Sequence, residues 1–322
     1  MYSFLISSSP VLYLNSLVFG LPGPKSSPPP AYLQILFFGS LLTLTRFLWD
    51  HLVLVPNGWQ TATDDKEREC LGGLVALTHS TLLLGPLFGL LMTHPTMKPS
   101  SQFSDSPPKW NYAAKTLISY TTSYMLQDAF WMLYYSTDPS QSAYPSPGEN
   151  DMMFLLHHLA TILYMSSCRY IDAGHYSAMW LMWLGEVTNP VHNVYLLLEY
   201  ARVNHPGENV EVLFFYFSKG EGDDVRVAQF TSFIDEFIIS NIVASLFSSP
   251  LLSSSLAFAL SYGLLRIFIG PLAGLWIVYD LILTPAGRKN VGLVLGIIWA
   301  ILIEEVLKGS FYYAFDVAIK AW

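Results

Sequence analysis

The stretch DMMFLLHHLATILYMSSC, residues 151–168, decides the fold class, because its interior is almost wholly apolar yet holds the adjacent His157 and His158. An apolar run of about 18 residues is typical of a membrane-spanning helix. Ionisable groups at mid-depth in a bilayer cost about 2.5–3.5 kcal/mol each on insertion scales, so they usually face a protein interior or a watery cavity. The stretch therefore predicts a helical membrane bundle that encloses a polar pocket.

The composition of the whole chain agrees with this interpretation. Of the 322 residues, 12% are charged and 52% are hydrophobic, whereas soluble domains average about 25% charged. The mean hydropathy is +0.39, and several apolar runs approach 20 residues, which indicates an all-α, polytopic transmembrane bundle. The net charge of −8 and the lack of a basic patch exclude a nucleic-acid partner.

The chain divides into an N-terminal segment, residues 1–30, and a transmembrane domain, residues 31–317. The N-terminal segment has no basic start, so we expect no cleaved signal peptide. Within residues 202–255, a loop or insertion, the apolar run 233–252 is an eighth span, a re-entrant piece or a surface helix. Seven principal spans are expected, separated by loops rich in Pro, Gly and Ser, at residues 31–55, 71–93, 113–135, 151–168, 173–199, 256–283 and 291–317.

Polar residues of six spans are predicted to meet at one depth. With a rise of 1.5 Å per residue and alternating span directions, they lie roughly 9–15 Å below the face where the first span ends. Glu186 lies deeper, at roughly 20 Å. An eighth span would reverse span 256–283 and remove its arginine from the layer, so the layer favours seven spans. The layer contains Arg46, His79, Asp128, His157, His158, Asn189 and Arg266.

The histidine pair supplies the catalytic candidates. His157 and His158 point about 100° apart on a helix, so one imidazole can react while the other orients or donates. Asp128 or His79 can orient a histidine of the pair, as carboxylates orient imidazoles elsewhere. The competing interpretation is a pair of hydrogen-bonded structural histidines in the bundle core.

A polar stripe on span 173–199 supplies the pocket candidates. Glu186, Asn189 and Asn193 follow i, i+3, i+7 spacing, and Pro190 frees a backbone carbonyl inside the membrane. Hydrogen bonding between helices is the competing interpretation of this stripe. Arg266, at its depth, is expected to have an anionic partner, with snorkelling to the surface as the alternative.

The sequence predicts no metal site. It holds a single adjacent histidine pair and no histidine box of the kind that di-iron membrane hydroxylases carry, and Cys70 and Cys168 form no CxxC motif. A GxSxG nucleophile motif is also absent from the sequence. We expect no bound cofactor.

Several segments together resemble the TLC domain shared by TRAM, Lag-type ceramide synthases and CLN proteins. The resemblance extends from about the first span to the last. It is carried by ALTHS (76–80), SYMLQDAFWML (123–133), LLHHLAT (155–161), LGEVTNPVHNVYLLLEY (184–200) and LLRIFIGP (264–271).

The resemblance implies a branch of that family. In ceramide synthases the His-His pair begins the Lag motif and two aspartates follow on the next span, whereas this chain has Glu186 and Asn189 there. It therefore resembles the members outside the synthase branch, which are tied to membrane phospholipid composition or lipid sensing.

The resemblance also implies three functions. The first is lipid homeostasis, by binding, sensing or remodelling lipid acyl chains in a pocket that includes His79, Glu186, Asn189, Asn193 and Arg266. The second is a ceramide-synthase-like N-acyltransferase, with acyl-CoA as co-substrate and His157 or His158 as nucleophile or general base, oriented by Asp128 or His79. The third is a non-enzymatic cargo or chaperone role in the endoplasmic reticulum.

Membrane lipids are the expected partners, and a homo- or hetero-oligomer stays open. The endoplasmic reticulum is the expected compartment, with another endomembrane or the plasma membrane as alternatives.

Overall fold

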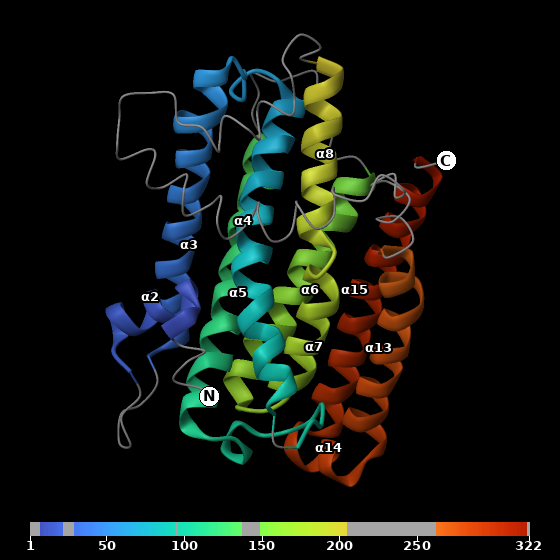
Figure 1. Ribbon diagram of the computed structural model, residues 1–322. Helices are drawn as coiled ribbons and strands as arrows, with labels where there is room; N and C mark the ends of the chain where they lie inside the picture. Colours follow the sequence, from blue (N-terminus) through green and yellow to red (C-terminus); the bar gives the residue numbers. More distant parts are fainter. Residues whose placement is uncertain (1–6, 22–28, 95, 137–148, 205–261, 321–322) are drawn as a thin grey trace.

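The computed structural model describes residues 7–21, 29–94, 96–136, 149–204 and 262–320. These residues form a bundle of long helices that run up and down side by side, and none of them lies in a strand (Figure 1). In chain order the helices are α2 (Pro10–Phe19), α3 (Ala31–Leu48) continued by η1 (Trp49–Leu54), the short η2 (Val55–Asn57), α4 (Asp65–Met92), η3 (Phe103–Asp105), α5 (Pro108–Ser136), α6 (Glu149–Ile171), α7 (His175–Glu186), α8 (Asn189–Asn204), η6 (Leu264–Ile269), α13 (Gly270–Val278), η7 (Tyr279–Leu283), α14 (Pro285–Asn290) and α15 (Leu293–Lys320).

The described part of each predicted span is a helix or a run of consecutive helices, so the expected all-α bundle is confirmed. Three helical segments among the described residues are long and apolar enough to cross a membrane: Ala31–Leu54, Asp65–Met92 and Leu264–Leu283. The count of seven spans stays a prediction. The run 233–252, and most of the predicted loop or insertion 202–255, lie outside the described residues.

Two predicted spans differ in detail from the helices. α4 begins six residues before the expected span, because the Asp64 carboxylate accepts a hydrogen bond of 2.9 Å from the Glu67 N–H and caps a charged first turn. The span 173–199 is broken at residues 187–188 into α7 and α8, directly before Pro190. This is the position at which Pro190 predicts an interrupted backbone ladder.

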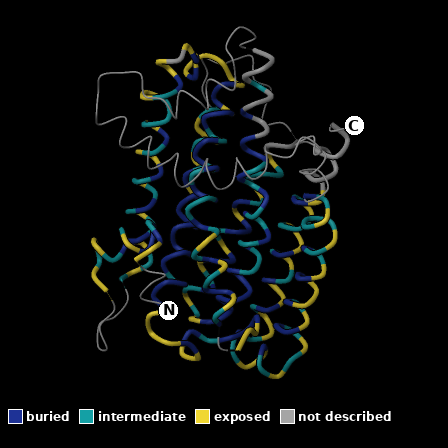
Figure 2. Tube along the Cα trace, in the orientation of Figure 1, coloured by how far each residue is buried: buried dark blue, intermediate teal, exposed yellow. Residues whose placement is uncertain are grey.

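The bundle is held by an apolar interior and surrounded by apolar surface. Trp110, Tyr120 and Phe38 are almost fully buried between α3, α4, α5 and α7, and Trp299 fills a second cluster between α6, α7, α13 and α15. Figure 2 shows burial concentrated along the inner helices and exposure on the outer faces of α3, α13 and α15. The exposed side chains of these outer faces include Leu36, Phe47, Leu272, Leu275, Val294 and Ile301. An apolar exterior of this kind fits contact with lipid.

The N-terminal helix α2 is part of the bundle. Asn15 is fully buried. Its amide donates to the Tyr112 hydroxyl at 2.6 Å and to the Thr116 hydroxyl at 3.1 Å, and its oxygen accepts from the Gln34 amide at 3.0 Å. These bonds tie α2 to α3 and α5, so the described part of segment 1–30 packs as one body with the helices that follow it.

A short loop closes the end of the bundle between α4 and α5. The His94 Nδ1 atom accepts hydrogen bonds from the N–H groups of Thr96 and Met97 at 3.2 and 2.9 Å, and its Nε2 atom lies 3.1 Å from the His175 Nε2 atom. Burial lowers the pKa of the His94 imidazole to about 4, against an opposing effect of the Asp105 carboxylate. His94 is therefore neutral in the folded protein near pH 7.

Gly174 is the N-cap residue of α7 at the same end of the bundle. Its φ is +75°, and a Cβ added there would stand 2.4 Å from the Trp299 ring. Only glycine fits this close approach in the left-handed conformation.

Three segments of the bundle are π-helical: η1, η6 and η7. Such turns are rare and occur frequently at functional sites. The turn η6 carries Arg266, one of the predicted pocket residues.

Candidate functional site

A cavity of about 650 Å³ lies inside the bundle, with walls from α3, α4, α5, α6, α7, α8, η6, α13 and α15. The structure brings seven of the eight predicted site residues to its wall. The eighth, His79, stacks on the ring of Tyr124, which itself lines the cavity. The seven residues are Asp128, His157, His158, Glu186, Asn189, Asn193 and Arg266.

His158 and Asp128 form an ion pair at the cavity wall. The Nε2 atom of His158 lies 2.9 Å from the Asp128 Oδ2 atom, and its Nδ1 atom lies 2.7 Å from the Phe154 carbonyl oxygen. A carbonyl oxygen only accepts, so Nδ1 carries a proton and donates it. A second proton is held between Nε2 and the carboxylate, because both hydrogen bonds need one. Both nitrogens of His158 are therefore engaged by the protein.

His157 faces a different neighbour, as the 100° rotation between consecutive residues predicts. Its ring lines the cavity and lies against Gly309 of α15, where an added Cβ would stand 3.7 Å from the His157 Nδ1 atom. The two histidine rings are edge to face with centroids 5.8 Å apart. Thr161 donates its hydroxyl proton to the His157 backbone carbonyl at 2.8 Å, and the His157 imidazole donates a hydrogen bond to the Val306 carbonyl of α15.

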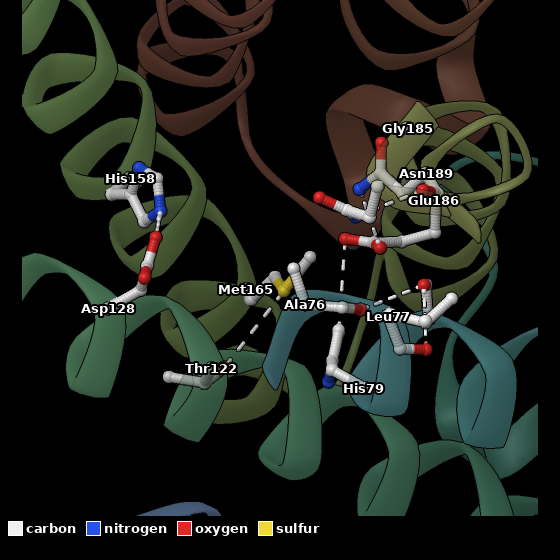
Figure 3. A network of polar contacts seen from close by, with 12 residues as sticks. Ala76, Leu77, His79, Thr122, Asp128, His158, Met165, Gly185, Glu186 and Asn189 are labelled. Carbon is white, nitrogen blue, oxygen red and sulfur yellow. Dashed lines mark hydrogen bonds and ion pairs between the residues drawn. The ribbon is translucent and has the colours of Figure 1, made fainter. Parts of the chain in front are cut away.

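A second polar group lies apart from the His158–Asp128 pair, as Figure 3 shows. His79 is fully buried, and its Nε2 atom is 3.8 Å from the Glu186 Oε1 atom. The other Glu186 oxygen accepts a hydrogen bond of 2.9 Å from the Asn189 amide, and Asn193 donates to the Asn189 carbonyl at 2.9 Å. Of the two residues predicted to orient a histidine of the pair, Asp128 is the one that contacts His158, whereas His79 lies beside Glu186.

Arg266 donates directly to neutral acceptors, and its charge also attracts the nearby Glu186 carboxylate, the group that comes closest to the predicted anionic partner. Its guanidinium donates to the Gly185 carbonyl, to the Ser310 hydroxyl at 2.9 Å and to the Asn189 amide oxygen at 3.4 Å. The last carbonyls of a helix have no partner within that helix. The break after α7 therefore leaves the Gly185 carbonyl open to Arg266, and Asn189 connects Arg266 to the Glu186 carboxylate.

Two arginines and two aromatic residues of the cavity wall, which were not among the predicted site residues, contact one another. The Arg46 guanidinium lies over the Trp131 ring at 5.0 Å and the Tyr135 ring at 5.7 Å, and that of Arg68 lies 4.3 Å from the Tyr135 ring. A sequence signal existed, because Arg46 has the same predicted depth as the histidines and residues 131 and 135 share a helix face. The cavity reaches the charged first turn of α4, where Arg68 pairs with Asp65 at 3.2 Å.

The rest of the cavity wall is largely apolar. Five methionines line it, together with leucines and isoleucines of α6, α7 and α15. Methionine is flexible and polarisable, so such a wall adapts to ligands of irregular shape. The five are Met125, Met132, Met153, Met165 and Met182. Among the residues that the structure describes, no three His, Cys, Asp or Glu side chains gather as a metal ion would require.

The comparison with protein families agrees with the positions of these residues. A family model described as the TLC domain matches residues 72–220. Residues 72–220 are therefore similar to a TLC domain. The matched region includes His79, Asp128, the histidine pair and the α7–α8 stripe. No curated protein and no solved structure matches the chain. The TLC domain and the apolar helices together indicate an integral membrane protein with a lipid-related function.

Proposed function

We propose that this TLC-domain protein acts in lipid homeostasis by binding, sensing or remodelling lipid acyl chains in its intramembrane cavity. We further propose that it belongs with the TLC proteins outside the ceramide-synthase branch and works in the endoplasmic reticulum. One observation carries the proposal: the wall of the cavity of about 650 Å³ combines many apolar side chains, five of them methionines, with a few polar groups that include His157, His158 and Asp128. Ligand sites are commonly about 300–1,000 Å³, mostly apolar, with a few placed polar groups.

The engagement of His158 supports binding over catalysis. In a Ser-His-Asp triad the carboxylate holds one imidazole nitrogen and the other takes the proton of the nucleophile. Here Asp128 holds Nε2 and the Phe154 carbonyl holds Nδ1, so no nitrogen of His158 is left for a substrate proton. Glu186 and Asn189 also replace the aspartate pair of the ceramide synthases. The arrangement suits a fixed, charged wall that recognises a ligand.

An N-acyltransferase is the second candidate, and the position of the His157 ring at the cavity wall, beside the charged His158–Asp128 pair, favours it. A buried imidazole oriented by a carboxylate is a common part of acid–base sites. Because both nitrogens of His158 are occupied, the general base or nucleophile of this candidate is His157, with His158 as its charged neighbour. Acyl-CoA would be the acyl donor.

The test begins with the full-length protein, purified in mild detergent. Mass spectrometry of the lipids that remain bound should find acyl lipids in the parent. His158→Ala and Glu186→Gln should reduce their amount in a graded way, by about tenfold for each lost hydrogen bond to a charged group. His51→Ala is the matched control, because His51 is exposed and does not line the cavity. It should retain the lipids of the parent.

Turnover separates the two candidates. With acyl-CoA and a sphingoid base, the purified parent should form no ceramide. Robust ceramide formation that His157→Ala abolishes, while the variant remains folded, would replace the binding function by the transferase, because only a reacting group matters selectively for the chemical step. A parent that retains no acyl lipid and forms no product would refute both.

A further inference from the structure

Arg46 is a buried cation at the cavity wall. It lies in the last turn of α3, has 6% of its surface exposed and lines the cavity. Its guanidinium stands over the rings of Trp131 and Tyr135. Arg68 faces the same Tyr135 ring, so two guanidinium groups approach one aromatic side chain at this end of the cavity.

The other charges near Arg46 already have partners. Arg68 pairs with Asp65 and also donates to the carbonyls of Thr61 and Ala62, while His158 pairs with Asp128. Within the described part of the chain, the Arg46 guanidinium makes neither an ion pair nor a hydrogen bond, and it stands over the two rings by cation–π contact. A buried charge without an ionic partner is costly, and cation–π contact offsets that cost only in part.

We propose that Arg46 binds the anionic group of the cavity's ligand. This inference rests on the proposed function and names its ligand class: an acyl lipid with an anionic oxygen group, either a phosphate or a carboxylate. The guanidinium matches both groups with a planar fork of donors. The acyl chain then extends along the methionines of α5, α6 and α7.

A phosphate and a carboxylate would both bind a guanidinium, so lipids that carry one or the other are tested separately. The full-length protein in detergent micelles is incubated with dioleoyl phosphatidic acid, with oleic acid or with dioleoylglycerol, which has the same acyl chains but no anionic group. Native mass spectrometry measures the bound fraction of each. The parent should prefer at least one anionic lipid over dioleoylglycerol by about tenfold to a hundredfold, the effect of a hydrogen-bonded charge. The anionic lipid that binds better shows whether the cavity recognises a phosphate or a carboxylate.

Three variants assign the preference to Arg46. Arg46→Gln should abolish it, and Arg46→Lys should retain part of it, because lysine keeps the charge but loses the fork. Arg288→Gln is the matched control, since it removes the same charge from the exposed end of α14, outside the cavity, and should behave as the parent. If Arg46→Gln does not fold, the reduced preference of Arg46→Lys tests the same assignment.

Each outcome decides the inference. A preference that persists in Arg46→Gln would overturn it, and so would one that Arg288→Gln abolishes equally. A parent that binds dioleoylglycerol as well as the anionic lipids would overturn the anionic class and leave the proposed function standing. A parent that binds none of the three lipids would overturn both.

Discussion

The His158–Asp128 pair permits a quantitative test by a double-mutant cycle. The perturbations are Asp128→Ala, His158→Ala and both together. At an effective dielectric constant of about 20, two charges about 4 Å apart attract by about 4 kcal/mol. Desolvation offsets part of this, and the Asp128 side chain keeps 25% exposure against 8% for His158. Hydrogen bonds to charged groups contribute about 1.5–3 kcal/mol. We therefore expect an interaction energy of about 2 kcal/mol, or about 30-fold in the unfolding equilibrium.

Asp128→Asn is the matched control for this cycle. Its amide can donate to the Nε2 atom of a neutral His158, whose Nδ1–H still donates to the Phe154 carbonyl. The loss should be below about 1 kcal/mol, while Asp128→Ala leaves a buried nitrogen unpaired and costs about 2–3 kcal/mol. The assay is equilibrium unfolding of the purified full chain in mixed micelles, followed by tryptophan fluorescence. An interaction energy under about 0.5 kcal/mol, the limit of simple additivity, would refute the assignment of a coupled pair.

Three further predictions concern stability. The parent should lose up to about 3 kcal/mol as pH falls from about 6.5 to about 4, because the folded pKa of His94 lies below its unfolded value and the unfolded chain binds the proton first. His94→Asn keeps an acceptor for the loop but cannot titrate, so an unaltered pH profile of unfolding in that variant would disprove the assignment. Gly174→Ala should lower the free energy of unfolding by at least about 3 kcal/mol, because the added methyl group would both strain the positive φ and clash with the Trp299 ring. Gly58 has a φ of +86° and open space around it, so Gly58→Ala should lower the free energy of unfolding by only about 1 kcal/mol. Equal losses for the two variants in thermal unfolding would contradict the clash. Asn15→Ala should cost about 2–3 kcal/mol by leaving buried partners unpaired; a loss under about 1 kcal/mol in denaturant titration would argue against docking of α2.

The helices were predictable because the apolar runs are long and the loops between them are polar. The apolar runs do not show which residues cap the helix ends or which residues far apart in the sequence contact one another. The charged turn that starts α4 reads as loop until Asp64 is seen to cap it. Helix α2 is too short to read as a span, and its place depends on Asn15 meeting Thr116 about a hundred residues later.

The sequence predicted the depth of the site residues along the bundle, but not the direction in which each side chain points around its helix. A fixed rise per residue places polar groups of different spans at one level, which is why seven of the eight candidates line one cavity. The direction of each side chain depends on how neighbouring helices pack, and this decides that Asp128 and not His79 binds His158. Arg46 was predicted to lie in the polar layer but not to line the pocket, because its aromatic neighbours come from another helix.

The π-helical turn η6 has an evolutionary consequence. Its i→i+5 bonding accommodates one residue more than an α-turn, and one residue corresponds to about 100° around a helix axis. Deleting a single residue from Leu264–Ile269 would restore the α-helical phase and turn Arg266 away from the open end of α7. A one-codon insertion or deletion in this turn is therefore a route by which related chains gain or lose a cation in the cavity while every neighbouring side chain stays the same.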